Sequence, residues 1–233
     1  MRLWFPAPLA LLSIAAWIAM WTAAPARAES LDSILASMDR TSKDFKSMSA
    51  RIKQTDYTAV IDETNIRAGE LHLKRAKGGL IALVNFETPE PRVIHLSGHK
   101  AEVYYPKAKT IEVYDTGKYS GAIDQLLLLG FGTSVEEMKK DYTIKLGSAE
   151  TVDGVPASRL DLTPKTAELQ KNVTTIQLWI PEGKSNPLQE KILKSSRDYT
   201  LISYSGLQLN PQLPDSAFAL NRPEGVREIH PQK

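Results

Sequence analysis

The sequence predicts an α+β fold in which one antiparallel sheet curls toward a barrel. In residues 66–115, apolar residues alternate with polar ones, and short turns interrupt the alternation. The same pattern returns in residues 142–209, whereas few segments have helical periodicity. A long antiparallel sheet with one apolar face and little helical cover tends to curl, and its interior then holds side chains or a ligand.

The first 28 residues have the features of an export signal. Arg2 precedes an apolar run over residues 3–24, and Ala26-Arg27-Ala28 fits a signal-peptidase site. A transmembrane anchor is the alternative, but two early prolines and the small residues at the end of the run favour cleavage. We therefore expect cleavage after Ala28 and a soluble mature protein in the periplasm.

The composition argues against several kinds of protein. The sequence has no cysteine, so neither a disulfide framework nor an acylated cysteine anchor is expected. Lys and Arg total 29 against 27 Asp and Glu, and removal of Arg2 and Arg27 makes the two totals equal. Phosphate binding needs a clustered positive surface, so we expect no nucleic-acid partner. We expect residues 29–233 to form one domain and the protein to be a monomer.

A helix and a strand are expected before the central strands. In residues 31–45 the apolar positions fall near one helical face, and Ser30 is placed to cap the helix. Residues 48–58 alternate and predict the first strand, with Gln54 pointing inward or lying at the rim. The helix would then cover the sheet.

The central strands follow in a meander. Leu71 and Leu73 point to one face and His72 to the other, as in a strand with one dry face. Glycine, proline and lysine residues mark the turns between four further predicted strands, at residues 80–86, 93–96, 101–105 and 110–114.

Residues 123–129 are too apolar for an ordinary surface helix, and they end in Gly130-Phe131-Gly132. One interpretation is a buried helix that ends at a glycine C-cap. The other is a mobile lid whose leucines fill an apolar cavity, and the sequence leaves both open. Residues 134–140 predict a further short helix capped by Ser134.

The second half repeats the strand pattern and ends in a tail. Residues 165–171 predict a short helix, and residues 214–220 predict a capped turn followed by a short strand. Strands are expected at residues 142–146, 158–162, 174–180, 189–196 and 200–209.

Two short motifs suggest chemistry that the surrounding sequence does not support. Asp115-Thr116-Gly117 matches the aspartic-protease triplet, but that mechanism needs two such carboxylates and a plain turn is favoured. His95 and His99 are four residues apart across a strand and its turn, so they would not share a face as zinc ligands. We therefore expect no enzyme, no metal and no cofactor.

Four segments, in their order and spacing, resemble the LolA family of periplasmic lipoprotein carriers, whose superfamily also includes lipoprotein receptors and lipid-binding lipoproteins. Residues 47–54 are similar to the family's first strand, with Gln54 on its glutamine. Residues 69–75 are similar to a later strand, with Arg75 on the family's arginine. Residues 93–105 and 218–226 resemble a central strand pair and the family's exit segment. Each motif is loose, but together they span most of the expected mature chain.

The resemblance implies a single antiparallel sheet curled into an unclosed half β-barrel, covered by the N-terminal helix and a helical lid. Arg75 would hold the lid through hydrogen bonds to backbone carbonyls. The expected lining of the cavity and lid comprises Leu71, Leu73, Leu83, Leu126, Leu127, Leu128, Leu129 and Phe131. The sequence departs from the family at Ala76, which replaces a proline, and at residues 80–84, which replace an aromatic strand, so the cargo need not be a triacylated lipoprotein.

The resemblance also implies partners. The cargo would be the acyl chains of a lipoprotein or lipid, moved from the inner to the outer membrane. An inner-membrane ABC lipoprotein-release complex would load the carrier, and an outer-membrane acceptor would unload it. The alternative is a lipid- or lipoprotein-sensing module of an envelope-stress regulator, which reuses the same fold.

Overall fold

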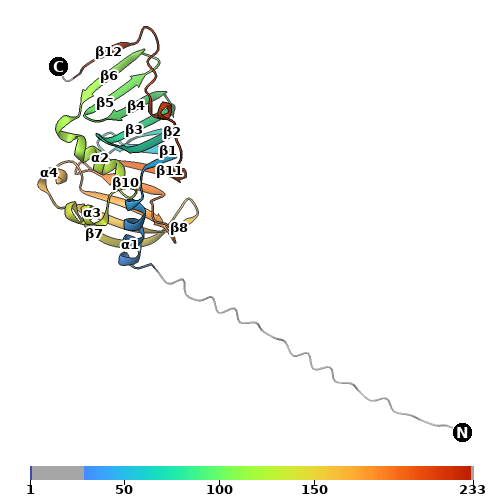
Figure 1. Cartoon of the computed structure of the whole chain (residues 1–233). Coiled ribbons are helices and arrows are strands. Elements are labelled where there is room, and N and C mark those ends of the chain that lie inside the picture. The colour runs from blue at the N-terminus through green and yellow to red at the C-terminus, as the bar shows by residue number, and fades with distance from the viewer. Residues whose placement is uncertain (2–28, 232–233) are drawn as a thin grey trace.

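The computed structural model describes Met1 and residues 29–231, so the expected export signal lies outside the described residues. The described chain forms one twelve-stranded sheet with helices against its concave side (Figure 1). The helices are α1 (Leu31–Lys43), α2 (Ser120–Leu128), α3 (Val135–Asp141) and α4 (Ala167–Gln170), with 3-10 turns η1 (Gly117–Tyr119) and η2 (Asp215–Phe218). Within the described residues, every helix is too short or too polar to cross a bilayer.

The strands confirm the predicted meanders; the first two strands of the second half are longer than predicted, whereas the one expected at residues 189–196 ends at Leu193. Asp153 and Gly154 form a tight turn with positive φ, so the expected strands at 142–146 and 158–162 are the outer parts of a long hairpin. The strands are β1 (Ser47–Thr58), β2 (Glu63–Ala76), β3 (Gly79–Thr88), β4 (Arg92–Ser97), β5 (Lys100–Tyr105), β6 (Thr110–Asp115), β7 (Tyr142–Val152), β8 (Val155–Pro164), β9 (Thr175–Pro181), β10 (Gln189–Leu193), β11 (Tyr199–Leu209) and β12 (Arg227–Ile229).

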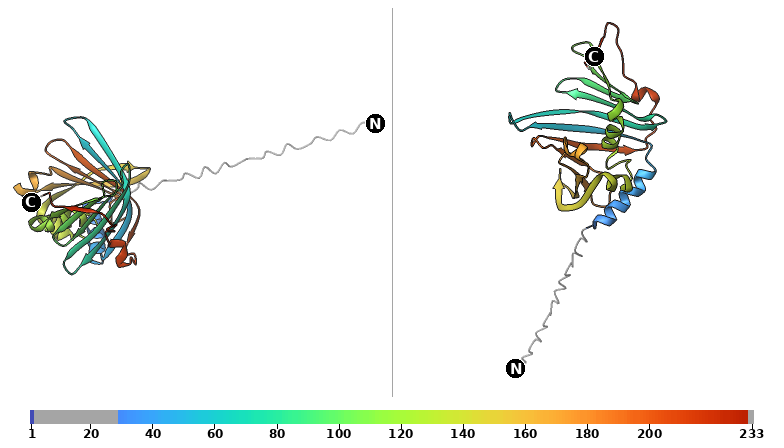
Figure 2. Two further views of the ribbon diagram at one scale, coloured as in Figure 1. Left: turned by 90° about the horizontal axis from the view of Figure 1, so that it is seen from above. Right: turned by 90° about the vertical axis from the view of Figure 1, so that its left-hand side faces the viewer.

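The sheet is an unclosed curl. Its order is β12-β6-β5-β4-β3-β2-β1-β11-β10-β9-β8-β7, and the curved strands leave two separate edges (Figures 1 and 2). The expected half-barrel is thus confirmed, but the expectation of a purely antiparallel sheet is wrong at one edge, where β12 pairs in parallel with β6. The tail reaches β6 after crossing the convex face rather than through a hairpin, so nothing forces an antiparallel direction.

The tail also differs from its predicted form. Residues 215–218 make the expected turn as η2, but the short strand follows only at residues 227–229. The intervening residues pack Leu220 and Val226 against a small convex-face cluster that contains Tyr104, Ile111 and Val113. Apolar cover on the convex side therefore delays the strand until the chain reaches the sheet edge.

The main core lies on the concave face in two parts. One part, hereafter the α1–β9 part, joins α1 and α3 to β8 and β9 through residues such as Met38, Leu160 and Leu178. The other, hereafter the β1–β3 part, joins β1, β2 and β3 through residues such as Met48 and Leu73. The fully buried leucines each contribute about 1.5–3 kcal/mol relative to exposure. This division leaves a seam between the two parts, and the segment after α2 lies across it.

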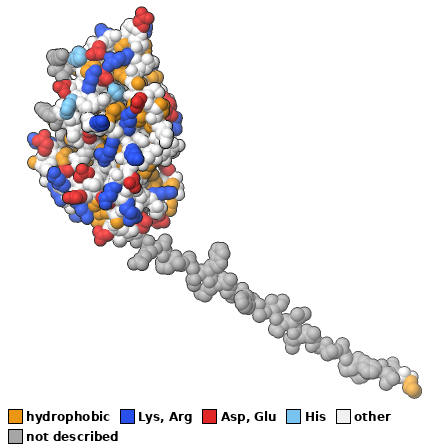
Figure 3. All heavy atoms as spheres, in the orientation of Figure 1, with side chains coloured by type: hydrophobic (Ala, Val, Ile, Leu, Met, Phe, Trp, Pro, Cys, Tyr) orange, Lys and Arg blue, Asp and Glu red, His pale blue; other side chains and the backbone are white. Residues whose placement is uncertain are grey.

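Helix α1 follows its sequence signals. The Ser30 side chain accepts a hydrogen bond from the Ser33 amide at 3.2 Å, which caps the helix. Ile34, Leu35 and Met38 are buried on one face. The helix ends at Lys43, two residues before the predicted limit. On the face that Figure 3 shows, acidic and basic side chains are interspersed without a broad patch of one sign.

Candidate functional site

The candidate site is the segment 120–133, hereafter the lid, together with the concave sheet beneath it. Helix α2 supplies its first part and contacts β3, and the chain then leaves the helix at Leu129 (Figure 1). Leu126 and Leu129 pack against the α1–β9 part of the core, whereas Leu127 and Leu128 pack against the β1–β3 part. The four leucines therefore join the two halves of the concave core.

Burial is uneven along these leucines. Leu129 is 0% exposed and Leu128 is 8% exposed, whereas Leu126 and Leu127 are only partly buried. The end of the segment is buried before its glycine turn, as the buried-helix interpretation predicts. The helix itself is only partly buried, as the lid interpretation predicts. Whether it moves stays a prediction.

The turn after α2 is closely fitted. Gly130 has a φ of +80°, and a Cβ atom there would lie 2.9 Å from the ring of Pro187. The Asn186 side-chain amide donates to the Gly130 carbonyl at 2.9 Å. A Cβ atom on Gly132 would lie 2.8 Å from the Phe45 ring. Both glycines are therefore required, the first also by its left-handed backbone.

Arg75 reaches this turn from the end of β2. Its guanidinium Nη2 donates to the Gly132 carbonyl, and its Cζ lies 5.9 Å from the centre of the Phe45 ring. Glu70, on the same strand, does not pair with Arg75 and accepts instead from Arg51 at 3.2 Å. Arg75 is exposed, so we expect its contact to be worth about 1 kcal/mol or less rather than a large share of stability.

A pocket of about 390 Å³ lies beside this contact, between the β2–β3 turn, α2 and α3. Asp124 accepts from the Leu80 amide at 3.2 Å, and burial raises the pKa of its carboxyl while that hydrogen bond and the nearby Arg75 charge act in the opposite direction. The lining mixes charged and apolar side chains: Arg75, Leu80, Asp124, Gln125, Leu128 and Asp141 are among them. Because of this mixed lining, the pocket at the base of the lid is not an apolar cavity of the kind that acyl chains would fill.

Not every predicted lining residue faces the concave side. Leu71 and Leu73 are 7% and 0% exposed and lie in the β1–β3 part of the core. Leu83 pairs with His72 and with His95, so it points to the convex face. Including Leu83 was therefore wrong, because the uninterrupted apolar run at 80–84 concealed that Leu80, Ala82 and Val84 are its inward members.

Residues 126–129 and Phe131 belong to the lid, and all of them pack against the concave core as predicted. Phe131 is 2% exposed, and its ring contacts that of Tyr204 edge-on with centroids 5.1 Å apart. The Tyr204 hydroxyl donates to Oε2 of Glu190 at 3.2 Å. Glu190 is 3% exposed, and burial raises its pKa to about 8, although the Tyr204 hydrogen bond acts in the opposite direction.

Sequence reasoning missed Glu190 and Tyr204. Glu190 pairs with Leu178 on one side and Ile202 on the other, which places it on the apolar concave face. The sequence signal that could have found Glu190 is the alternation along β10: residues two apart share a face of a strand, and Ile192 is an apolar residue two positions after Glu190.

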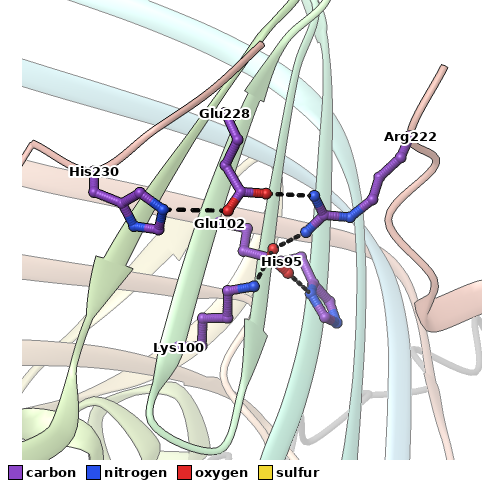
Figure 4. A network of polar contacts seen from close by, with 6 residues as sticks. All are labelled: His95, Lys100, Glu102, Arg222, Glu228 and His230. Atoms are coloured by element: carbon purple, nitrogen blue, oxygen red, sulfur yellow. Dashed lines mark hydrogen bonds and ion pairs between the residues drawn. The ribbon is translucent and has the colours of Figure 1, made fainter. Parts of the chain in front are cut away.

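A polar network on the convex face has a structural role. Glu102, 5% exposed on β5, accepts from Lys100 at 2.7 Å, contacts His95 at 3.0 Å and pairs with Arg222 of the tail (Figure 4). Arg222 and His230 also contact Glu228, which belongs to β12. Burial raises the pKa of Glu102, but Lys100, His95 and Arg222 together outweigh burial and hold it below its usual value. The network fastens the tail to the sheet.

The Asp115-Thr116-Gly117 triplet and the pair His95 and His99 make local structural contacts. The Asp115 carboxylate accepts from the Gly117 amide at 2.8 Å, which confirms a turn. His99 contacts the Ser120 hydroxyl at 3.1 Å, away from His95. Over Met1 and residues 29–231, no three side chains of His, Cys, Asp or Glu are grouped to hold a metal.

The chain was compared with known proteins. A family model described as outer membrane lipoprotein carrier protein LolA matches residues 43–221. An outer-membrane lipoprotein carrier protein of Cupriavidus pinatubonensis is 34% identical over 97 residues, and this match spans 41% of each chain.

Solved structures are similar in fold. An uncharacterized conserved protein from Thermus thermophilus has a TM-score of 0.52 at 10% identity, over 87% of this chain and 99% of that one. MucB has a TM-score of 0.50 at 11% identity, over 82% of this chain and 62% of that one. Because the family model spans most of the chain, from residue 43 to residue 221, the protein belongs to the LolA family of outer membrane lipoprotein carrier proteins.

Proposed function

We propose that the protein is an exported periplasmic carrier that shields the acyl chains of a lipoprotein or lipid on its concave face and moves them from the inner to the outer membrane. The observation that carries this proposal is the lid, whose leucines join the two halves of the concave core. Acyl chains present the same aliphatic surface as leucine side chains. Cargo can therefore lie between the lid and the sheet, exchanging lid–sheet contacts for lid–cargo and cargo–sheet contacts, without exposing the sheet to water.

The energetics of this exchange agree with a carrier that holds no energy source of its own. Burial of acyl chains from water yields about 0.8 kcal/mol per methylene, but chains that leave a bilayer were already dry. Transfer from membrane to carrier is then close to neutral. Loading needs an external driver, for which the family resemblance suggests an inner-membrane ABC lipoprotein-release complex, with an outer-membrane acceptor downstream.

The proposal is tested with the protein lacking residues 1–28, added to spheroplasts that retain newly made lipoproteins on the inner membrane. We expect lipoproteins to appear in the supernatant in a soluble complex with the added protein, and to pass to outer-membrane vesicles afterwards. Serum albumin at equal concentration controls for nonspecific extraction. Release no greater than with albumin, and no lipid in the purified complex by mass spectrometry, would contradict the carrier.

Arg75→Leu should loosen the lid without unfolding the protein. The change removes the hydrogen bond to the Gly132 carbonyl, which we expect to be worth about 1 kcal/mol, so the open population should rise about fivefold. We expect loaded protein to lose a fluorescent acyl cargo to acceptor vesicles about fivefold faster, with a melting temperature within a few degrees of wild type.

The matched control is Arg51→Leu, which removes a half-exposed arginine that pairs with Glu70 and Glu87 away from the lid. This control should transfer cargo at the wild-type rate. Equal transfer rates for Arg75→Leu and Arg51→Leu would remove Arg75 from the lid mechanism.

A second candidate is a sensing module, which the likeness in fold to MucB favours. In that case lipid would change the affinity of the concave face or its edges for a regulatory protein rather than travel to an acceptor. The transfer experiment separates the two, because a sensor would bind lipid and yet give no delivery to outer-membrane vesicles.

A further inference from the structure

Glu190 lies on the floor of the concave face, at the seam that the lid covers. Its strand neighbours in register are Leu178, from the α1–β9 part of the core, and Ile202, which packs against the β1–β3 part. The carboxyl is therefore surrounded by aliphatic side chains on both sides, in the region where the proposed function places acyl chains.

One of the two carboxyl oxygens lacks a partner. Tyr204 donates to Oε2, whereas Oε1 is buried and accepts or donates no hydrogen bond among the described residues. Leaving a buried polar atom unpaired costs free energy, and such an atom in a folded protein calls for an explanation. A purely structural role at this position would be served as well by a leucine, or by a glutamine whose amide oxygen and nitrogen both form hydrogen bonds.

The Glu190 carboxyl is linked to the lid through Tyr204, the partner of its other oxygen. The ring of Tyr204 contacts Phe131, and the Phe131 amide donates to the Leu128 carbonyl at 2.9 Å, so Phe131 is part of the turn that closes α2. Cargo that entered beneath the lid, as the proposed function requires, would separate Phe131 from Tyr204. The same movement would bring the cargo next to the hydroxyl and the carboxyl.

We propose that Glu190, with Tyr204 beside it, is a polar anchor that hydrogen-bonds the carbonyl group of an acyl ester or acyl amide in the cargo; this inference rests on the proposed carrier function. The pair would select chains attached through a carbonyl over plain hydrocarbon or ether-linked chains. It would also fix how deeply the acyl chains enter, because their carbonyl ends must reach the seam.

The chemistry of the site favours a carbonyl over a charged group. Burial raises the pKa of the carboxyl and keeps it protonated at neutral pH, so it offers an O–H donor. No basic side chain among the described residues forms an ion pair with it, so the site supplies no charge for a phosphate or carboxylate. The acyl carbonyl is the polar group that always accompanies an ester- or amide-linked chain into an apolar cavity.

The test uses two probes that differ only in the linkage: dimyristoyl phosphatidylcholine, which has ester carbonyls, and its di-O-tetradecyl ether analogue, which has none. Binding to the protein lacking residues 1–28 is measured for both at pH 7. We expect the ester lipid to bind about threefold to tenfold more tightly, as one additional hydrogen bond implies. The shared headgroup and chain length cancel in the comparison.

Two variants assign that preference to Glu190. Glu190→Gln keeps an N–H donor of similar size and should keep the preference, whereas Glu190→Leu should bind both probes equally. Both variants should remain folded, since each removes a group that is costly to ionise in the interior. Thermal melts confirm this before binding is measured.

The outcomes separate the inference from the function on which it rests. If wild-type protein binds neither probe, the carrier proposal fails and the anchor fails with it. If wild-type protein binds both probes equally, the anchor is overturned and the carrier stands. A preference that survives in Glu190→Leu also overturns the assignment, because the carbonyl is then recognised elsewhere.

Discussion

The free energy of unfolding of the protein lacking residues 1–28 is expected to fall by about 3 kcal/mol between pH 5 and pH 8, and Glu190→Gln is expected to remove most of that fall. The pKa of Glu190 is raised by burial from 4.5 to about 8 in the folded protein. Between those values the folded state holds a proton that the unfolded state has lost. Stability then decreases as pH rises, by up to roughly 1.4 kcal/mol per pH unit.

The groups around Glu190 do not offset this effect. Tyr204 from β11 and Tyr142 at the start of β7 are the titratable side chains that interact with it, and burial raises the pKa of each. Both therefore stay neutral through the window. Carboxylates whose pKa is lowered, such as Glu102 and Glu150, affect stability only in the acid range, because the stability that they contribute is lost as pH falls below about 4.5. Stability should be highest near pH 5.

Urea unfolding at pH 5, 6.5 and 8 measures this dependence, with the midpoint and slope recorded for both proteins. At pH 5 the two proteins should differ little, and at pH 8 Glu190→Gln should be the more stable. Glu150→Gln is the matched control, since Glu150 is a partly exposed carboxylate held by Trp179 and Arg159. It should leave the fall between pH 5 and pH 8 unchanged. A parallel dependence in wild type and Glu190→Gln would show that Glu190 is ionised in the folded protein.

Local signals predicted the fold well wherever local interactions determine it. The cap at Ser30, the apolar stripe of α1 and the alternation of β1 and β2 led to the observed elements, because each records which face is dry. The hairpin turns followed from residues such as Asp153 and Gly154 that accept positive φ. These features need no knowledge of distant contacts.

The errors arose where distant contacts decide. Leu83 lies in an apolar run whose two faces are both covered, one by the core and one by the tail, so alternation is absent. The parallel pairing of β12 depends on the path of a tail held by Arg222 and Glu102, which are 120 residues apart. Glu190 is an ordinary polar position in its own strand, and only the pairing with Leu178 and Ile202 shows that it is buried.

The lid is the part of the site whose two interpretations, a mobile lid or a buried helix, most need a test. Leu127→Ser with Leu128→Ser should weaken retention of acyl lipid at least tenfold, because the serines replace two aliphatic side chains that meet the β1–β3 part of the core. Leu127 is partly buried and α2 rests mainly on β3, so we expect a loss of only about 1–3 kcal/mol in stability.

Ile111→Ala is the contrast, because Ile111 lies on the convex face away from the lid and the concave sheet. Ile111 is 0% exposed in the cluster with Tyr104 and Val113, so truncation should cost about 2–5 kcal/mol and lower the melting temperature strongly, while lipid retention measured well below that temperature stays near wild type. Lipid retention is measured by gel filtration of protein loaded with a fluorescent acyl lipid, and stability by urea unfolding. If the double serine variant instead loses stability as Ile111→Ala does and retains lipid normally, residues 126–129 are ordinary core, and the cargo must be held on another part of the sheet.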